Sequence, residues 1–127
     1  MKKLKKLPEA ELEVMNAVWA EESDDITTPV LTAALSESKN WTQQTVLTLL
    51  RRLEGRGFLT STKIGKECIF SPIVSKDEYV RFESEAFLKA FHKNSLAGLM
   101  RTLYNGKALK DEDYDELKRF LDEKKEN

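Results

Sequence analysis

The stretch from Trp41 to Cys68 constrains the fold more than any other part of the chain, because a helical repeat passes directly into two short strand patterns. Thr42 is a suitable N-cap, and the apolar residues after it recur at the spacing of one helix face. These residues are Val46, Leu49, Leu50 and Leu53. The opposite face holds Gln44, Thr48 and Arg51. We therefore expect a helix with one buried side and one polar, solvent-facing side.

A two-stranded hairpin is predicted after that helix. The segment from Phe58 to Lys63 is rich in threonine and apolar residues, as strands commonly are. A second short strand is expected from Glu67 to Ser71, and Pro72 closes it. Ile64-Gly65-Lys66 supplies a tight connection between the two strands.

Two more helices are predicted upstream. The first begins after Pro8 and ends near Glu22. The second opens at the capping pair Thr28-Pro29 and ends around Ser38. Three helices followed by a hairpin give the element order of a winged helix-turn-helix domain, which we expect to span residues 1–74 of a mainly α-helical chain.

The last third of the chain predicts helices with wide apolar faces. Ser75 and Glu78 form a capping box at the start of the first helix, and further apolar repeats begin at Leu96 and near Lys110. This region is too small to bury its aromatic side chains alone, so we expect residues 75–127 to form a helical dimerisation region with a second copy of the chain. The expected dimer-interface residues are Phe82, Phe87, Phe91, Leu96, Leu99, Met100, Leu103, Tyr104, Leu117, Phe120 and Leu121.

Charge is distributed unevenly along the chain. The formal net charge is −1, yet between Lys39 and Lys66 six basic residues accompany a single acid, Glu54. Salt screens an exposed charge beyond about 8 Å, so the charge of a segment matters more than the sum over the chain. The helix and hairpin therefore present a local positive surface.

This surface carries the side-chain types that binding to double-stranded DNA requires. Arg and Lys neutralise phosphates, whereas Gln and Thr can hydrogen-bond to base edges. We expect these residues to lie nearest the bases: Gln43, Gln44, Thr45, Leu47, Thr48 and Arg51. We expect these to contact phosphates or form the wing: Thr42, Arg52, Lys63 and Lys66.

Three of these assignments have plainer alternatives. Leu47 could contact a thymine methyl, but packing within the protein explains it equally well. Thr42 could hold a phosphate at the helix N-terminus, and simple capping is compatible with that role. Lys63 and Lys66 could instead belong to a merely solvated turn.

Other classes of function find little support. The only histidine, His92, lacks a nucleophile or base pattern around it, so we expect no enzyme activity, metal site or cofactor. The only cysteine, Cys68, excludes an internal disulfide and is expected to be a small buried residue on a strand. No apolar run is long enough to span a bilayer and no signal peptide is recognisable, so we expect a cytoplasmic protein without membrane insertion.

Several of these segments together resemble the penicillinase-repressor (BlaI/MecI) family. The matching segments are Leu7 to Met15, Val18-Trp19, Trp41-Thr42, Thr45-Val46, Thr48 to Gly57, Lys63 to Pro72 and Glu78-Tyr79. The resemblance covers nearly the whole chain. It implies a dimeric winged-helix repressor that sits on a palindromic operator, controls antibiotic-resistance or stress genes in bacteria, and dimerises through its C-terminal helices.

The resemblance also bears on how such a repressor is released. Family members are commonly cleaved by a membrane-sensor protease system near an Asn–Phe bond in the fifth helix, and the equivalent bond here is Thr102–Leu103, which departs from that pattern. A copper-responsive branch ends in paired Cys-x-Cys motifs, which this chain lacks. The alternative function is a winged-helix protein-interaction module that does not contact DNA.

Overall fold

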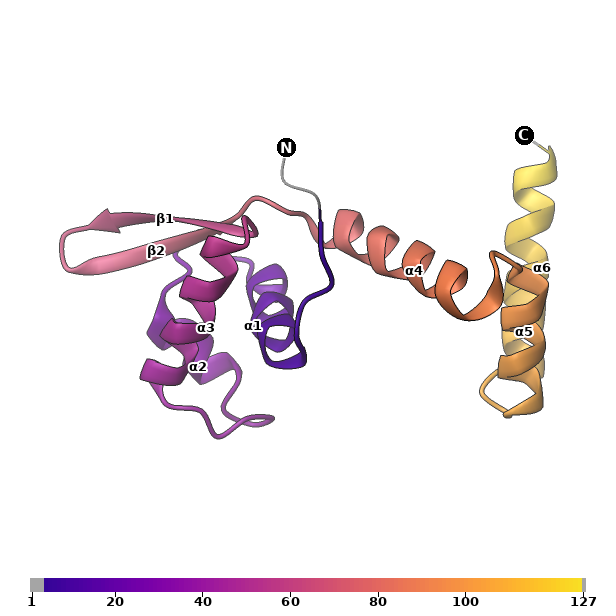
Figure 1. The fold of residues 1–127 in the computed structure, drawn as a ribbon, viewed down its shortest axis with the longest axis horizontal. Coiled ribbons are helices and arrows are strands. Elements are labelled where there is room, and N and C mark those ends of the chain that lie inside the picture. The colour runs from indigo at the N-terminus through magenta and orange to yellow at the C-terminus, as the bar shows by residue number, and fades with distance from the viewer. Residues whose placement is uncertain (1–3, 127) are drawn as a thin grey trace. The chain divides into compact units, whose positions relative to one another are not determined.

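The computed structural model describes residues 4–126 and is mainly α-helical with one small hairpin, as the sequence predicted (Figure 1). In chain order, the elements are α1 (Glu9–Ala20), α2 (Thr28–Ala34), α3 (Gln43–Gly55), β1 (Leu59–Ile64), β2 (Glu67–Pro72), α4 (Lys76–His92), α5 (Leu96–Asn105) and α6 (Asp111–Glu126). The chain separates into two compact units, Met1–Glu83 and Ser84–Asn127, with the boundary inside α4. The expected functional boundary, between residues 74 and 75, lies just before that helix.

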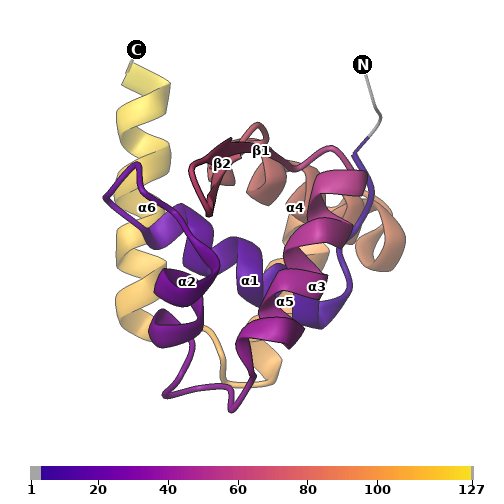
Figure 2. The same cartoon turned by 90° about the vertical axis from the view of Figure 1, so that its left-hand side faces the viewer.

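The first unit is built on a core shared by three helices and the base of the hairpin (Figure 2). The predicted apolar stripe of α3 is fully buried, which confirms that part of the sequence analysis. It packs against buried side chains of α1 and α2. The same buried cluster contains Val14, Met15, Val18, Leu31, Phe58 and Phe70. Burial of one side of α3 fixes its polar side toward solvent.

Two helices end earlier than the sequence predicted. The first helix ends at Ala20 rather than near Glu22, because Glu21 already has an extended backbone. The second ends at Ala34, four residues before Ser38. There the hydroxyl of Ser36 donates to the Ala33 carbonyl, and such side-chain bonds compete with helix continuation.

The hairpin is antiparallel, with Lys63 opposite Cys68 and Ile64 opposite Glu67. Gly65 has a φ of 65°, in the left-handed region that a glycine adopts without strain, so it suits the tight turn. β1 begins and ends one residue later than predicted, and β2 extends one residue further, through Pro72. At its base the hairpin is tied to the helices, because the Phe70 N–H donates to the Ile26 carbonyl at 2.8 Å.

The first turn of α4 belongs to the core of the first unit. Tyr79 is buried, and its hydroxyl accepts a hydrogen bond of 2.8 Å from the Leu7 N–H. Its ring lies edge-on to Phe58 and within 5.8 Å of the Trp19 ring centroid. The Trp19 indole N–H in turn donates to the Val74 carbonyl at 3.0 Å. These contacts hold the start of α4 against α1 and against the segment that precedes α1.

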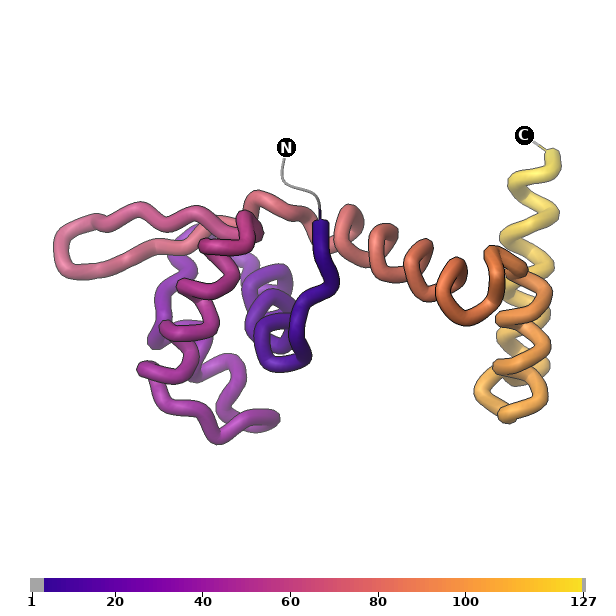
Figure 3. The backbone as a smooth tube through the Cα atoms, viewed as in Figure 1, coloured from indigo at the N-terminus to yellow at the C-terminus, as the bar shows by residue number. Residues whose placement is uncertain are grey.

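The second unit contains the rest of α4 with α5 and α6, whose backbone can be followed in Figure 3. None of its described residues is buried. Several large apolar side chains are instead at least one-third exposed: Phe87, Phe91, Leu96, Leu103, Tyr104, Tyr114, Phe120 and Leu121. Among the described residues of the whole chain, no helix is both long enough and apolar enough to cross a membrane.

Candidate nucleic-acid interface

The N-terminus of α3 is capped as the sequence predicted. Thr42 is exposed, and its hydroxyl oxygen accepts a hydrogen bond of 3.2 Å from the Thr45 N–H. The other N–H groups of the first turn have no partner inside the helix, which makes a helix N-terminus suitable for an anion. Capping by Thr42 is therefore established, whereas a phosphate contact there stays a prediction.

The outer face of α3 is a row of exposed polar side chains. Gln43, Gln44, Thr45 and Thr48 are all exposed above the buried stripe. The Thr48 hydroxyl donates to the Gln44 carbonyl at 2.9 Å, so its oxygen can still accept a hydrogen bond. Within the described residues, neither glutamine side chain is hydrogen-bonded to the protein. Their amides can each offer a donor and an acceptor to another molecule.

Leu47 lies at the edge of this face and is half-buried against the core. Its packing interpretation therefore has support in the structure. The contact between Leu47 and a thymine methyl stays a prediction.

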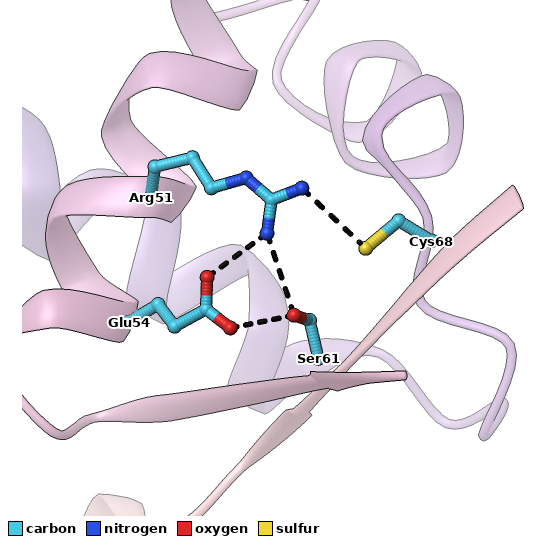
Figure 4. Close-up of polar contacts among 4 residues, drawn as sticks. All are labelled: Arg51, Glu54, Ser61 and Cys68. Carbon is cyan, nitrogen blue, oxygen red and sulfur yellow. Dashed lines mark hydrogen bonds and ion pairs between the residues drawn. The ribbon is translucent and has the colours of Figure 1, made fainter. Parts of the chain in front are cut away.

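Arg51 is placed differently from its neighbours on α3. Its guanidinium Nη1 donates to Glu54 Oε1 at 2.9 Å and to Ser61 Oγ at 3.4 Å, while Nη2 donates weakly to Cys68 Sγ at 3.7 Å (Figure 4). Its side chain is 50% exposed. Arg51 was expected to lie nearest the bases, and in the structure its guanidinium is bonded to two side chains of the hairpin, Ser61 on β1 and Cys68 on β2.

Glu54 completes this group. Its Oε2 accepts a hydrogen bond of 2.5 Å from the Ser61 hydroxyl, while Oε1 holds Arg51. The hydrogen bond from Ser61, followed by that from Arg51, lowers the pKa of Glu54 below its ordinary value of 4.5. The hydrogen bond to Glu54 raises the pKa of Arg51. Both groups are therefore charged at neutral pH.

Cys68 is half-buried, so its expected full burial is wrong. The reason lies in its position along β2: Phe70 faces the core, whereas Cys68 is two residues closer to the hairpin tip on the same face. At that position Cys68 packs only at the edge of the core, and the Arg51 guanidinium lies against its thiol.

The remaining expected DNA contacts are all exposed. Lys63 and Lys66 lie at or next to the hairpin turn, and Arg52 lies on the last turns of α3. The structure thus brings Arg51 of α3 together with Ser61 and Cys68 of the hairpin. Lys63 lies directly opposite Cys68 on β1, and Lys66 lies in the turn beyond it.

Sequence reasoning missed the partner of Arg56. Its Nε donates to Glu11 Oε1 at 2.7 Å, and its Nη2 donates to Glu11 Oε2 at 3.2 Å. The Glu11 carboxylate is buried, and hydrogen bonding to it raises the pKa of Arg56. No local spacing could have indicated this pair, because its members are 45 residues apart. Arg56, one of the six basic residues between Lys39 and Lys66, therefore stabilises the fold by pairing with Glu11.

The expected dimer-interface residues fall into two groups. Phe82 is half-buried against the core of the first unit, with its ring centroid 5.9 Å from that of Tyr79. The others lie in the second unit, where Leu99, Met100 and Leu117 are half-buried and the rest are exposed. Phe87 and Phe91 pack on each other at 5.0 Å between ring centroids and remain exposed.

The sequence model of one family, described as penicillinase repressor, matches residues 7–123. The chain belongs to the penicillinase-repressor family. A relative in the same family, the penicillinase repressor of Bacillus licheniformis, is 31% identical over 98% of this chain and 96% of its own length. The methicillin resistance regulatory protein MecI of Staphylococcus aureus is 24% identical over 91% of this chain and 92% of its own.

Two solved structures from this family are similar to this chain. One is the solution structure of the B. licheniformis BlaI monomer in complex with the blaP half-operator, with a TM-score of 0.50 and 34% identity. The other is the DNA-binding domain of the repressor BlaI, with a TM-score of 0.52 and 33% identity. Each match covers 62% of this chain and 94% of the other. The winged-helix fold and the expected family are confirmed, and the penicillinase-repressor family consists of transcriptional repressors rather than enzymes.

Proposed function

We propose that this chain is a sequence-specific transcriptional repressor that binds a palindromic DNA operator as a homodimer. The observation that carries the proposal is the exposed polar face of α3, held outward by a fully buried stripe in a fold shared with a DNA-binding domain. The BlaI structure solved with a half-operator supports the same use of the fold in this chain. The alternative, an interaction module that does not bind DNA, is not favoured by these relatives.

We assign different tasks to the two parts of the interface. Gln43, Gln44, Thr45 and Thr48 are exposed on α3 and are suited to base edges in the major groove. Thr42, Arg52, Lys63 and Lys66 are suited to phosphates on either side, because they lie at the helix ends and at the hairpin turn. Leu47 and Arg51 are assigned to neither group alone, because Leu47 packs against the core and Arg51 is bonded to Glu54 and Ser61.

The homodimer is proposed from the second unit. A helical unit without a buried side chain among its described residues does not have a core of its own. A second copy offers matching apolar faces, and a two-fold pair places two α3 helices on half-sites about one DNA turn apart or a multiple of it. A palindromic operator follows from that symmetry.

The setting of the repressor comes from its family. We infer a cytoplasmic protein that controls antibiotic-resistance or stress genes, as the resemblance implies. Release by a membrane-sensor protease system stays a prediction. The bond equivalent to the family's cleavage site, Thr102–Leu103, lies within α5, where both residues are exposed and the Thr102 hydroxyl donates to the Gly98 carbonyl.

Selection of bound fragments from a pool of random duplex DNA tests this function. The full chain should enrich a palindrome with two half-sites, and its affinity should fall steeply with added salt because phosphate contacts release counterions. If no sequence were enriched over the starting pool, the proposal would fail. Binding without salt dependence would favour the interaction-module alternative.

A further inference from the structure

An acid on the DNA-facing side of a repressor needs an explanation. Glu54 is the only acidic residue between Lys39 and Lys66, and it lies on α3 beside Arg51. Its carboxylate is charged at neutral pH, so it repels phosphates nearby. A negative charge there weakens DNA binding unless the contacts of Glu54 within the protein strengthen DNA binding by more than this repulsion weakens it.

The contacts of Glu54 join the recognition helix to the wing. Figure 4 shows the carboxylate of Glu54 between the Arg51 guanidinium and the Ser61 hydroxyl, so that α3 and β1 are bridged by one acid. Arg51 extends the bridge to β2 through Cys68. Its guanidinium also lies 5.5 Å from the ring centroid of Phe70, a fully buried residue on the same strand.

We propose that Glu54 is a positioning residue for operator recognition: together with Ser61 it holds Arg51 in one orientation and fixes the hairpin against α3. The α3 face and the hairpin lysines then meet a DNA duplex as one preformed surface. This inference rests on the proposed function, since positioning matters only if the surface binds DNA.

The effect on sequence specificity can be seen by comparing Arg51 held by Glu54 and Ser61 with an Arg51 side chain that is free to move. A free arginine side chain has many rotamers and pairs with any phosphate, which strengthens binding to unrelated sequences. A held guanidinium has one position, which suits only a duplex that presents an acceptor there. The pair is half exposed, and exposed ion pairs contribute little to folding, so its main effect is on orientation.

The sign of the effect of Glu54→Gln separates positioning from simple repulsion. If Glu54 only repels DNA, the substitution tightens binding to the operator and to unrelated DNA alike. If Glu54 positions Arg51, the substitution weakens operator binding by about three- to fivefold while unrelated DNA binds as well as before or better. The probes are the palindrome that the wild-type chain selects and a scrambled duplex of the same length.

Glu67→Gln is the matched control. Glu67 is an exposed acid at the start of β2, and it is outside the cluster in Figure 4. Its neutralisation should tighten binding to both duplexes together. Ser61→Ala changes no charge, so it should weaken operator binding without altering the salt dependence. On an Arg51→Ala background, Ser61→Ala should have no further effect on the operator.

Hydrogen exchange of the full chain without DNA supplies a second readout. Amides in residues 59–72 should exchange faster in Glu54→Gln and Ser61→Ala than in the wild type, and Glu67→Gln should leave them unchanged. Tighter operator binding by Glu54→Gln, or unchanged hairpin exchange, overturns this inference. If the wild-type chain shows no preference for any sequence, the proposed function fails instead.

Discussion

The buried carboxylate of Glu11 on α1 receives two hydrogen bonds from Arg56, the residue that caps the C-terminus of α3. This contact fixes one end of the recognition helix to the first helix of the domain. It also accounts for an acidic residue in the core, because a buried carboxylate needs both charge and hydrogen-bond partners.

The two members of this pair should respond differently to substitution. Arg56→Ala leaves the Glu11 carboxylate buried without its partner, so it should lower the free energy of unfolding markedly. Glu11→Leu removes the buried charge itself and leaves Arg56 in water, so it should cost much less. Urea denaturation of both variants measures the difference, with exposed Arg52→Ala as a control expected to stay close to the wild type. Equal losses for Arg56→Ala and Arg52→Ala would contradict this account of the pair.

The Tyr79 hydroxyl should contribute to the stability of the first unit. Tyr79→Phe keeps the aromatic packing but removes the acceptor of the buried Leu7 N–H, so we expect a loss of about 1–3 kcal/mol in the free energy of unfolding. Thermal or urea denaturation measures it. A loss below about 0.3 kcal/mol would mean that the Leu7 amide finds another partner.

Tyr79 should also produce a loss of stability at alkaline pH. Burial, and then the hydrogen bond to Glu83, raises the pKa of Tyr79 from 10.0 to about 12. Because the folded-state pKa is raised, the stabilisation is fully present below pH 10 and declines as pH rises from there toward 12. The free energy of unfolding should therefore fall over this window more steeply in the wild type than in Tyr79→Phe. Identical pH profiles for the two proteins would count against a buried, protonated hydroxyl.

The exposed aromatic residues of the second unit should be buried by a second copy of the chain. Phe91 is 72% exposed, and burial of a phenylalanine contributes roughly 1.5–3 kcal/mol, so Phe91→Ser should raise the dimer dissociation constant by about tenfold or more. Sedimentation equilibrium measures that constant. Val80→Ser, which alters an exposed apolar residue of α4 in the first unit, should leave it unchanged. A monomeric wild type would show that these faces have another role.

Sequence periodicity predicted those features that depend on neighbours along the chain. The apolar stripe of α3, its Thr42 cap and the Gly65 turn were all predictable, because each depends on residues within about four positions. The early end of α2 was not, since hydroxyls such as that of Ser36 bond to the backbone only in the final geometry.

The contacts that modify the candidate site were beyond sequence reasoning because they join distant residues. Arg51 meets Ser61 and Cys68, which are 10 and 17 positions away on two different strands. Periodicity correctly put Arg51 on the polar face, but only the placement of the hairpin shows that its guanidinium already has partners. The exposed fraction of Cys68 likewise depends on how far along the hairpin the core extends.

The central claim is that the exposed face of α3 reads base edges. Gln44 tests it most directly, because the residue is exposed and its side-chain amide is hydrogen-bonded to none of the described residues. In a titration of the selected palindrome against Gln44→Ala, we expect operator affinity to fall by about 1–3 kcal/mol while affinity for a scrambled duplex stays unchanged. Unchanged affinity for the palindrome, or equal losses on both duplexes, would contradict the claim.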